Sequence, residues 1–126
     1  MKLSNLIGIP YVEGSHSLAG GGLDCVGACL AFYDAAGMNE ARTQLAQAVL
    51  LGGPSRDWAA VYPADGYLIG DLVFTVASTG EAHVAVIVSV APEITLSSAR
   101  LQGTYLRPLA EMRGLVGVYR PTLGTE

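Results

Sequence analysis

The chain has 126 residues, of which 51% are hydrophobic and only 14% are charged, and its formal net charge is −4. This length suits a single domain, which we expect to span residues 1–126. The acidic balance and the lack of a Lys/Arg cluster exclude a nucleic-acid partner, because no basic patch exists to neutralise phosphates. Pro10 cuts the first apolar run short, and no later run reaches the about 18 apolar residues of a membrane span. We therefore expect neither a signal peptide nor membrane insertion.

The first helix is predicted to begin at Cys25. Residues 8–23 are rich in Gly and Ser and indicate a loop before it. Asp24 is a suitable N-cap, and Gly37 supplies a C-terminal stop. The apolar residues at helical spacing between them are Cys25, Ala28, Cys29 and Phe32.

A second helix is predicted from Asn39, as its N-cap, to the Gly-Gly-Pro break at residues 52–54. Its inward face is expected to carry Ala41, Leu45, Ala48 and Val49. A short third helix is expected from Ser55 through Trp58 to about Tyr62.

Beyond Gly70 the hydrophobic period changes from helical to extended. Three segments rich in β-branched residues read DLVFTVAS, HVAVIVSV and EITLSSA, and the breaks between them contain Gly80 and Pro92, as hairpins require. The tail is expected to add one or two strands within TYLRPL and LVGVYRP, around a turn or short helix near residues 110–113. Helices followed by an antiparallel sheet predict an α+β fold.

Cys25 is a candidate nucleophile because of its place at a helix N-terminus. Unpaired backbone N–H groups and the positive end of the helix dipole favour a thiolate there, so the position is expected to lower the pKa of the thiol. The same N–H groups can receive the oxyanion of a tetrahedral intermediate. Simple packing is the alternative, since cysteine is among the most commonly buried residues. Cys29, one turn further along, is assigned to packing.

A nucleophilic thiol needs a base, and the chain has two histidines. His83 opens a predicted strand, where its ring can project toward a helix packed on the sheet, whereas His16 lies in a glycine-bounded loop with nothing to fix it. We therefore favour His83 as the base. The histidines and the two cysteines do not form a recognised zinc pattern, so no metal site is expected.

Four segments, taken in order, resemble the NlpC/P60 family of cysteine peptidases. They are the G-x-P-Y segment of GIPYVEGS, the D-C-x-G turn of GGGLDCVG, the GDLVF strand and the HV strand that follows it. The resemblance runs from about Gly8 to Val90, and the closing GVYRP segment has the same character. It implies a papain-like α+β core in which a cysteine and a histidine cleave amide bonds of peptidoglycan stem peptides, without a cofactor.

Carried over to this chain, the resemblance makes Cys25 the nucleophile and His83 the general base. Tyr11, from the G-x-P-Y segment, becomes a candidate for lining the substrate cleft, although it can equally be a core tyrosine with its hydroxyl at the surface. Asp24 stands beside the nucleophile as a candidate substrate contact, but an N-cap without catalytic duty is its simpler role.

The third catalytic position departs from the family pattern. Members place a His, Asn or Gln on the strand after the histidine, where it orients the imidazole. That strand here is EITLSSA, which makes Thr95 the candidate orienter, with Ser97 and Glu93 as alternatives. A hydroxyl stabilises imidazolium less well than a stronger acceptor, so weakened or lost catalysis is expected.

Family members of this kind occur as tail-tip proteins of bacteriophages and related particles. The resemblance therefore implies a tail-associated peptidoglycan endopeptidase, located on the virion tail among other tail proteins. The low charged fraction fits packing in such an assembly, although small alanines on exposed helix faces would also explain it. A secreted antibacterial amidase effector would share the site, whereas a structural tail subunit without activity would share only the fold.

Overall fold

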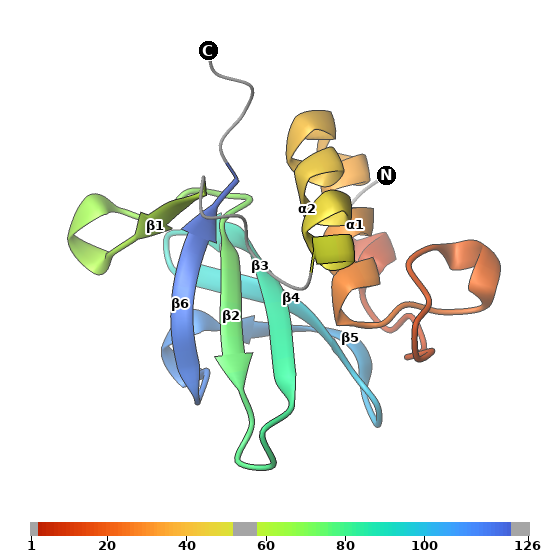
Figure 1. Ribbon diagram of the computed structural model, residues 1–126. Coiled ribbons are helices and arrows are strands. Elements are labelled where there is room, and N and C mark those ends of the chain that lie inside the picture. The colour runs from red at the N-terminus through yellow and green to blue at the C-terminus, as the bar shows by residue number, and fades with distance from the viewer. Residues whose placement is uncertain (1–2, 52–57, 122–126) are drawn as a thin grey trace.

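The computed structural model describes residues 3–51 and 58–121, and it has an α+β fold. Two helices, α1 (Cys25–Ala36) and α2 (Asn39–Leu51), lie on one side of an antiparallel sheet (Figure 1). The sheet has the strand order β1-β6-β2-β3-β4-β5. Its strands are β1 (Ala59–Val61), β2 (Leu72–Val76), β3 (Ala82–Val90), β4 (Glu93–Ala99), β5 (Gly103–Pro108) and β6 (Leu115–Arg120). None of the helices in the described ranges is long and apolar enough to cross a membrane.

The ends of α1 follow the local signals in the sequence. The Asp24 carboxylate accepts a hydrogen bond from the Gly27 N–H at 2.7 Å, as an N-cap should. Gly37 ends the helix in the left-handed conformation, with φ of 71°. Between them α1 buries Ala28, Cys29, Leu30, Phe32 and Tyr33 against the sheet.

The start of α2 differs from the prediction. Asn39 is the first helical residue rather than the cap, because the carbonyl of Met38 already accepts a hydrogen bond from the Arg42 N–H at 3.0 Å. Ala41, Leu45 and Ala48 are buried as expected. Val49 is 37% exposed, so its assignment to the inward face was wrong.

The third predicted helix is also wrong where the structure describes it. Residues 59–61 form strand β1, while residues 52–57 lie outside the described ranges. β1 pairs antiparallel with β6, and Val61 is buried opposite Val118. This pairing with a distant strand overrides the weak local preference of a short Ala-rich segment.

Strand β3 is apolar on both faces because the sheet has a core on each side. Val84, Val86 and Val88 belong to the core beneath α1 and α2. Ala85 and Ile87 belong to a second core on the opposite face. That face is covered in part by η4 (Leu109–Glu111), a short 3-10 helix between β5 and β6. Burial on both faces explains why HVAVIVSV is a nearly continuous apolar run rather than an alternating one.

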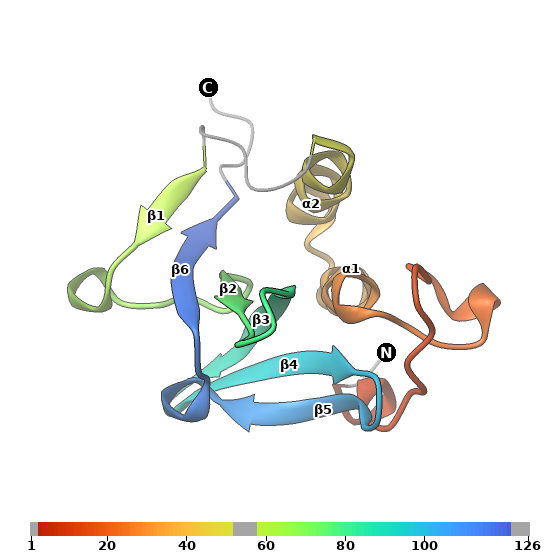
Figure 2. The same cartoon turned by 60° about the horizontal axis from the view of Figure 1, so that its bottom comes forward.

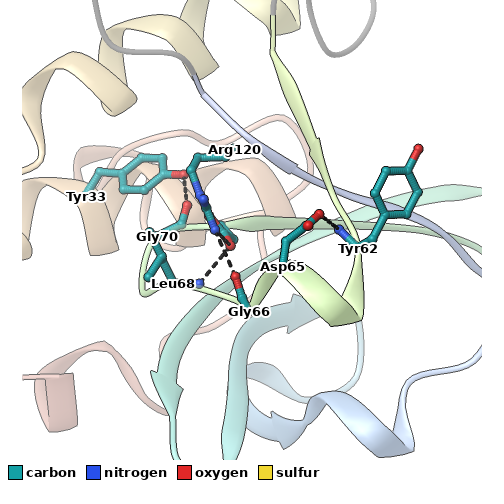
Figure 3. A network of polar contacts seen from close by, with 8 residues as sticks. Tyr33, Tyr62, Asp65, Gly66, Leu68, Gly70 and Arg120 are labelled. Atoms are coloured by element: carbon teal, nitrogen blue, oxygen red, sulfur yellow. Dashed lines mark hydrogen bonds and ion pairs between the residues drawn. The ribbon is translucent and has the colours of Figure 1, made fainter.

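A polar network anchors the start of β2 (Figure 3). Asp71, only 1% exposed, accepts hydrogen bonds from Nε and Nη2 of Arg120, each at 2.8 Å. The Tyr33 hydroxyl donates to the Gly70 carbonyl at 2.5 Å and so ties α1 to the same turn. Burial raises the pKa of Tyr33, which keeps the hydroxyl protonated as a donor.

Candidate active site

The sheet opens between β3 and β4, close to the start of α1. The hydrogen-bonded ladder between these strands ends at the Val86–Leu96 pair. Beyond it, β3 still pairs with β2 as far as Ala82, while β4 still pairs with β5 as far as Ala99. Beyond the Val86–Leu96 pair, β3 therefore stays paired with β2 alone, and β4 stays paired with β5 alone. A gap is left between the first residues of β3 and the last residues of β4, and Figure 2 shows the bend of the sheet there.

The thiol of Cys25 lies at this gap. The Ile87 N–H donates to the Asp71 carbonyl on the β2 side of β3. Successive N–H groups of a strand alternate in direction, so the N–H of Val84, three residues earlier, faces the gap on the β4 side. Hydrogen bonds from the backbone of Val84 and of Val26 act on the Cys25 sulfur and favour its thiolate. The backbone of a strand and that of a helix N-terminus therefore both favour the thiolate of Cys25.

Burial nevertheless raises the pKa of Cys25 above its ordinary value. Desolvation is the largest cause and the Asp24 carboxylate adds to it, while the backbone hydrogen bonds only partly oppose the rise. The expectation that a helix N-terminus alone lowers the pKa of this thiol is wrong, because desolvation of the partly buried sulfur outweighs the backbone hydrogen bonds. Cys25 is a neutral thiol at pH 7.

The pH dependence of Cys25 alkylation checks this direction. We expect the rate with iodoacetamide to rise about tenfold per pH unit from pH 7 and to level off only above pH 9, since the thiolate is the reactive form. Mass spectrometry of the intact protein would follow the reaction, and the buried Cys29 should stay unmodified. A rate that is already constant at pH 7 would mean that the helix N-terminus outweighs burial.

His83 lines the same cavity as Cys25, which has a volume of about 680 Å³. By the alternation of β3, His83 belongs to the face of Ala85 and Ile87, opposite the face beneath α1. Among the described residues no hydrogen bond joins the His83 ring to Cys25. The cavity connects the two side chains at the gap, where residues from both faces of the sheet line it.

The electrostatics of His83 suit a proton acceptor. Burial lowers the pKa of the imidazole, and the Glu81 carboxylate opposes this only in part. The ring is therefore neutral at pH 7. The cavity thus contains a neutral thiol and a neutral imidazole rather than a preformed thiolate–imidazolium pair.

A second, smaller cavity of about 210 Å³ lies next to Cys25 and His83. Leu45, Ala48 and Val49 of α2 form one of its sides, and Phe74 of β2 forms another. Val49, wrongly expected in the core, is therefore partly exposed in this apolar hollow. The arrangement offers an apolar contact surface beside the thiol.

Thr95 does not lie beside His83. It pairs with Ile87, four residues and about 13 Å along β3 from His83. Its hydroxyl donates to the Arg107 carbonyl at 2.9 Å and lies 3.6 Å from the Met112 sulfur. The prediction that Thr95 orients His83 is therefore wrong.

Of the two alternatives, Ser97 is the better placed. Glu93 pairs with Val90 at the opposite end of β3 from His83. Extending the register of the Val86–Leu96 pair sets Ser97 across from Ala85, on the face to which His83 belongs. Ser97 is fully buried, and its hydroxyl has no hydrogen-bond partner within the described part of the chain.

Tyr11 lines the cavity together with Cys25, in keeping with the predicted cleft position. Its hydroxyl donates to the Glu13 carboxylate at 3.1 Å, and the Arg100 guanidinium lies 5.8 Å from the centre of its ring. Partial burial raises the pKa of Tyr11, and the hydrogen bond to Glu13 adds to the rise. Its hydroxyl is therefore a donor throughout the neutral range.

Asp24 is placed as a cap and not as a substrate contact. One carboxylate oxygen holds the Gly27 N–H, and the other lies 3.3 Å from Nε2 of His16. Asp24 does not line the cavity that contains Cys25, so the proposed substrate-binding role is corrected to an N-cap. His16 is likewise not the unfixed loop residue of the prediction, since Asp24 holds it.

Gly27 carries the sequence signal for this arrangement. A Cβ there would lie 2.5 Å from the Ser15 carbonyl oxygen, so the loop before α1 can cross its first turn only over a glycine. The D-C-x-G pattern thus combines a cap with a place for the loop to cross. Across residues 3–51 and 58–121, no group of three or more His, Cys, Asp or Glu residues could hold a metal ion.

The arginines around the cavity were not singled out from the sequence. Arg100, Arg107 and Arg113 all line it, although they lie in different segments. The expectation that the chain has no Lys/Arg cluster overlooked one signal, since three of its seven basic residues fall within residues 100–113. No protein-family model matches this chain, and no curated protein matches it.

Proposed function

We propose that the protein is a cysteine peptidase with a papain-like NlpC/P60 core, which hydrolyses amide bonds of peptidoglycan stem peptides. One observation carries the proposal: Cys25, the first residue of α1, and His83 line the same cavity. A thiol, a neutral base and backbone donors are the parts that acyl transfer needs. Two of the four segments that resemble the family contain Cys25 and His83.

In the proposed reaction the His83 ring turns through the gap toward Cys25 and takes its proton. The sulfur attacks the carbonyl carbon of the scissile amide, and the resulting oxyanion accepts hydrogen bonds from the backbone donors at the start of α1 and on β3. Protonated His83 then gives its proton to the leaving amine as the C–N bond breaks. Water, activated by His83, hydrolyses the thioester and releases the carboxylate product and the Cys25 thiol.

The proposed setting is the tail of a bacteriophage or a related particle, with other tail proteins as partners. The low charged fraction of the chain supports this setting, since assembled subunits expose less of their own surface. Several large apolar side chains are also exposed, including Leu50, Leu101 and Val116.

Digestion of purified peptidoglycan tests the proposed activity. We expect mass spectrometry to find cut stem peptides after incubation with the protein. Prior treatment with iodoacetamide should prevent the cleavage, because Cys25 is partly exposed and Cys29 is buried. Cleavage that persists after complete alkylation of Cys25 would contradict the proposal.

A structural subunit without catalytic activity is the second candidate function. It is favoured by the absence, within the described ranges, of a hydrogen bond between His83 and Cys25. Such a subunit would fold normally and cut no stem peptide, and its Cys25 would be alkylated at the same rate whether His83 is present or replaced by Gln. A rate that depends on His83 would favour the peptidase instead.

A further inference from the structure

The cavity around Cys25 is basic, although the chain as a whole is acidic. Among the described residues, three arginines and one acidic residue, Glu81, line it, whereas the formal net charge of the chain is −4. A partly enclosed cavity concentrates such a field and raises the local concentration of ligands of the opposite charge. The charges of the cavity therefore favour an anionic ligand.

Arg100 contributes little to this field because acidic partners already engage it. Its guanidinium lies 2.8 Å from the Glu13 carboxylate and 3.5 Å from that of Glu81. It also lies over the ring of Tyr11. These contacts hold Arg100 against the loop before α1, which contains Tyr11 and Glu13.

Arg107 and Arg113 have no such partners within residues 3–51 and 58–121. Both side chains are exposed, and neither guanidinium forms an ion pair or a hydrogen bond with any residue that the structure describes. Arg107 lies on β5, and Arg113 follows η4 on the way to β6. Both line the cavity together with Met112, whose sulfur contacts Thr95 on the face of the sheet to which His83 belongs. Two guanidiniums that have no ion-pair partner in the described part of the chain thus flank the cavity on the β5 side.

We propose that Arg107 and Arg113 form a carboxylate-binding subsite, so that the ligand of this cavity is an acidic peptide with a free carboxylate on the β5 side of Cys25. The planar guanidinium matches a carboxylate with two parallel hydrogen bonds, which makes arginine a specific receptor for this group. The subsite deepens the proposed peptidase function and rests on it for the identity of the peptide. The subsite positions the peptide, because the distance from the bound carboxylate to Cys25 determines which amide bond reaches the thiol.

Isothermal titration calorimetry tests the subsite in a Cys25→Ala background, which prevents turnover. The two probes are a soluble stem-peptide fragment with free carboxylates and the same fragment with its carboxylates amidated. We expect the free acid to bind roughly tenfold to hundredfold more tightly, as charge-assisted hydrogen bonds predict, and to bind more weakly as salt is added. Replacing both arginines, Arg107→Gln with Arg113→Gln, should remove the preference. Arg42→Gln, on α2 and away from the cavity, should keep it.

The binding results are independent of hydrolysis, so the two proposals can fail separately. Equal affinity for both probes, or a preference that survives the double replacement in a protein with an unchanged circular dichroism spectrum, would overturn the subsite. If the protein with Cys25 intact cuts the amidated fragment as fast as the acid, the subsite also fails while the peptidase stands. Selective binding of the acid without cleavage of either probe would support the subsite and count against the peptidase.

Discussion

Replacing Cys25 with alanine is expected to abolish hydrolysis of stem peptides while leaving the protein folded. Loss of the nucleophile removes the covalent route, and comparable deletions lower the rate by about 10³-fold or more. The sulfur is at the edge of the core and partly exposed, so its removal should change the free energy of unfolding by less than about 1 kcal/mol. Product formation measured by mass spectrometry, together with urea denaturation, checks both parts.

Cys29→Ala is the matched control, because it removes the same atom one turn further along α1. Cys29 is fully buried in the core beneath the helix, and burial keeps its thiol neutral by raising its pKa well above the ordinary value. We expect a loss of about 1–2 kcal/mol in stability and no loss of activity at temperatures where the variant is folded. A folded Cys29→Ala protein without activity would overturn the assignment of separate roles to the two cysteines.

The parts of the fold that depend on neighbours in sequence could be predicted, and the parts that depend on distant strands could not. Asp24 and Gly37 mark the ends of α1 because a cap and a stop act within one helical turn. Strands β2, β3 and β4 lie in the three segments rich in β-branched residues, and β5 and β6 lie in the two tail segments. Strand β1 is not visible, because its three residues are held by β6, which follows more than fifty residues later.

The site shows the same division between local and long-range signals. The sequence points to Cys25 and His83, and the structure places both in one cavity. The sequence could not show that Thr95 lies away from His83, because that position depends on the register of the β3–β4 hairpin rather than on the spacing of residues. Nor could it give the pKa of Cys25, since desolvation by packed strands outweighs the local helix dipole.

Arg120→Met is expected to destabilise the protein by about 3–5 kcal/mol, more than either cysteine substitution. Asp71 is 1% exposed, and Arg120 supplies two of its hydrogen bonds, so removing the guanidinium leaves a buried carboxylate without its counter-charge. Arg42→Met is the matched control. Arg42 pairs with Asp34 at 2.6 Å at the surface, where loss of an ion pair should change stability by less than about 1 kcal/mol. The urea midpoints of the two variants give the comparison.

Asp71→Asn added to Arg120→Met should recover much of the lost stability, because the neutral amide removes the buried charge. The amide oxygen can still accept a hydrogen bond from the Leu68 N–H, which lies 2.8 Å from the Asp71 carboxylate in the wild-type protein. The same turn also receives the Ile87 N–H, which sets the register of β3 and so fixes where Val84 meets Cys25. We therefore expect Arg120→Met, studied at a temperature where it is folded, to change the rate of Cys25 alkylation, and the double variant to restore it. Alkylation that stays at the wild-type rate in both variants would show that the network stabilises the fold without positioning the thiol.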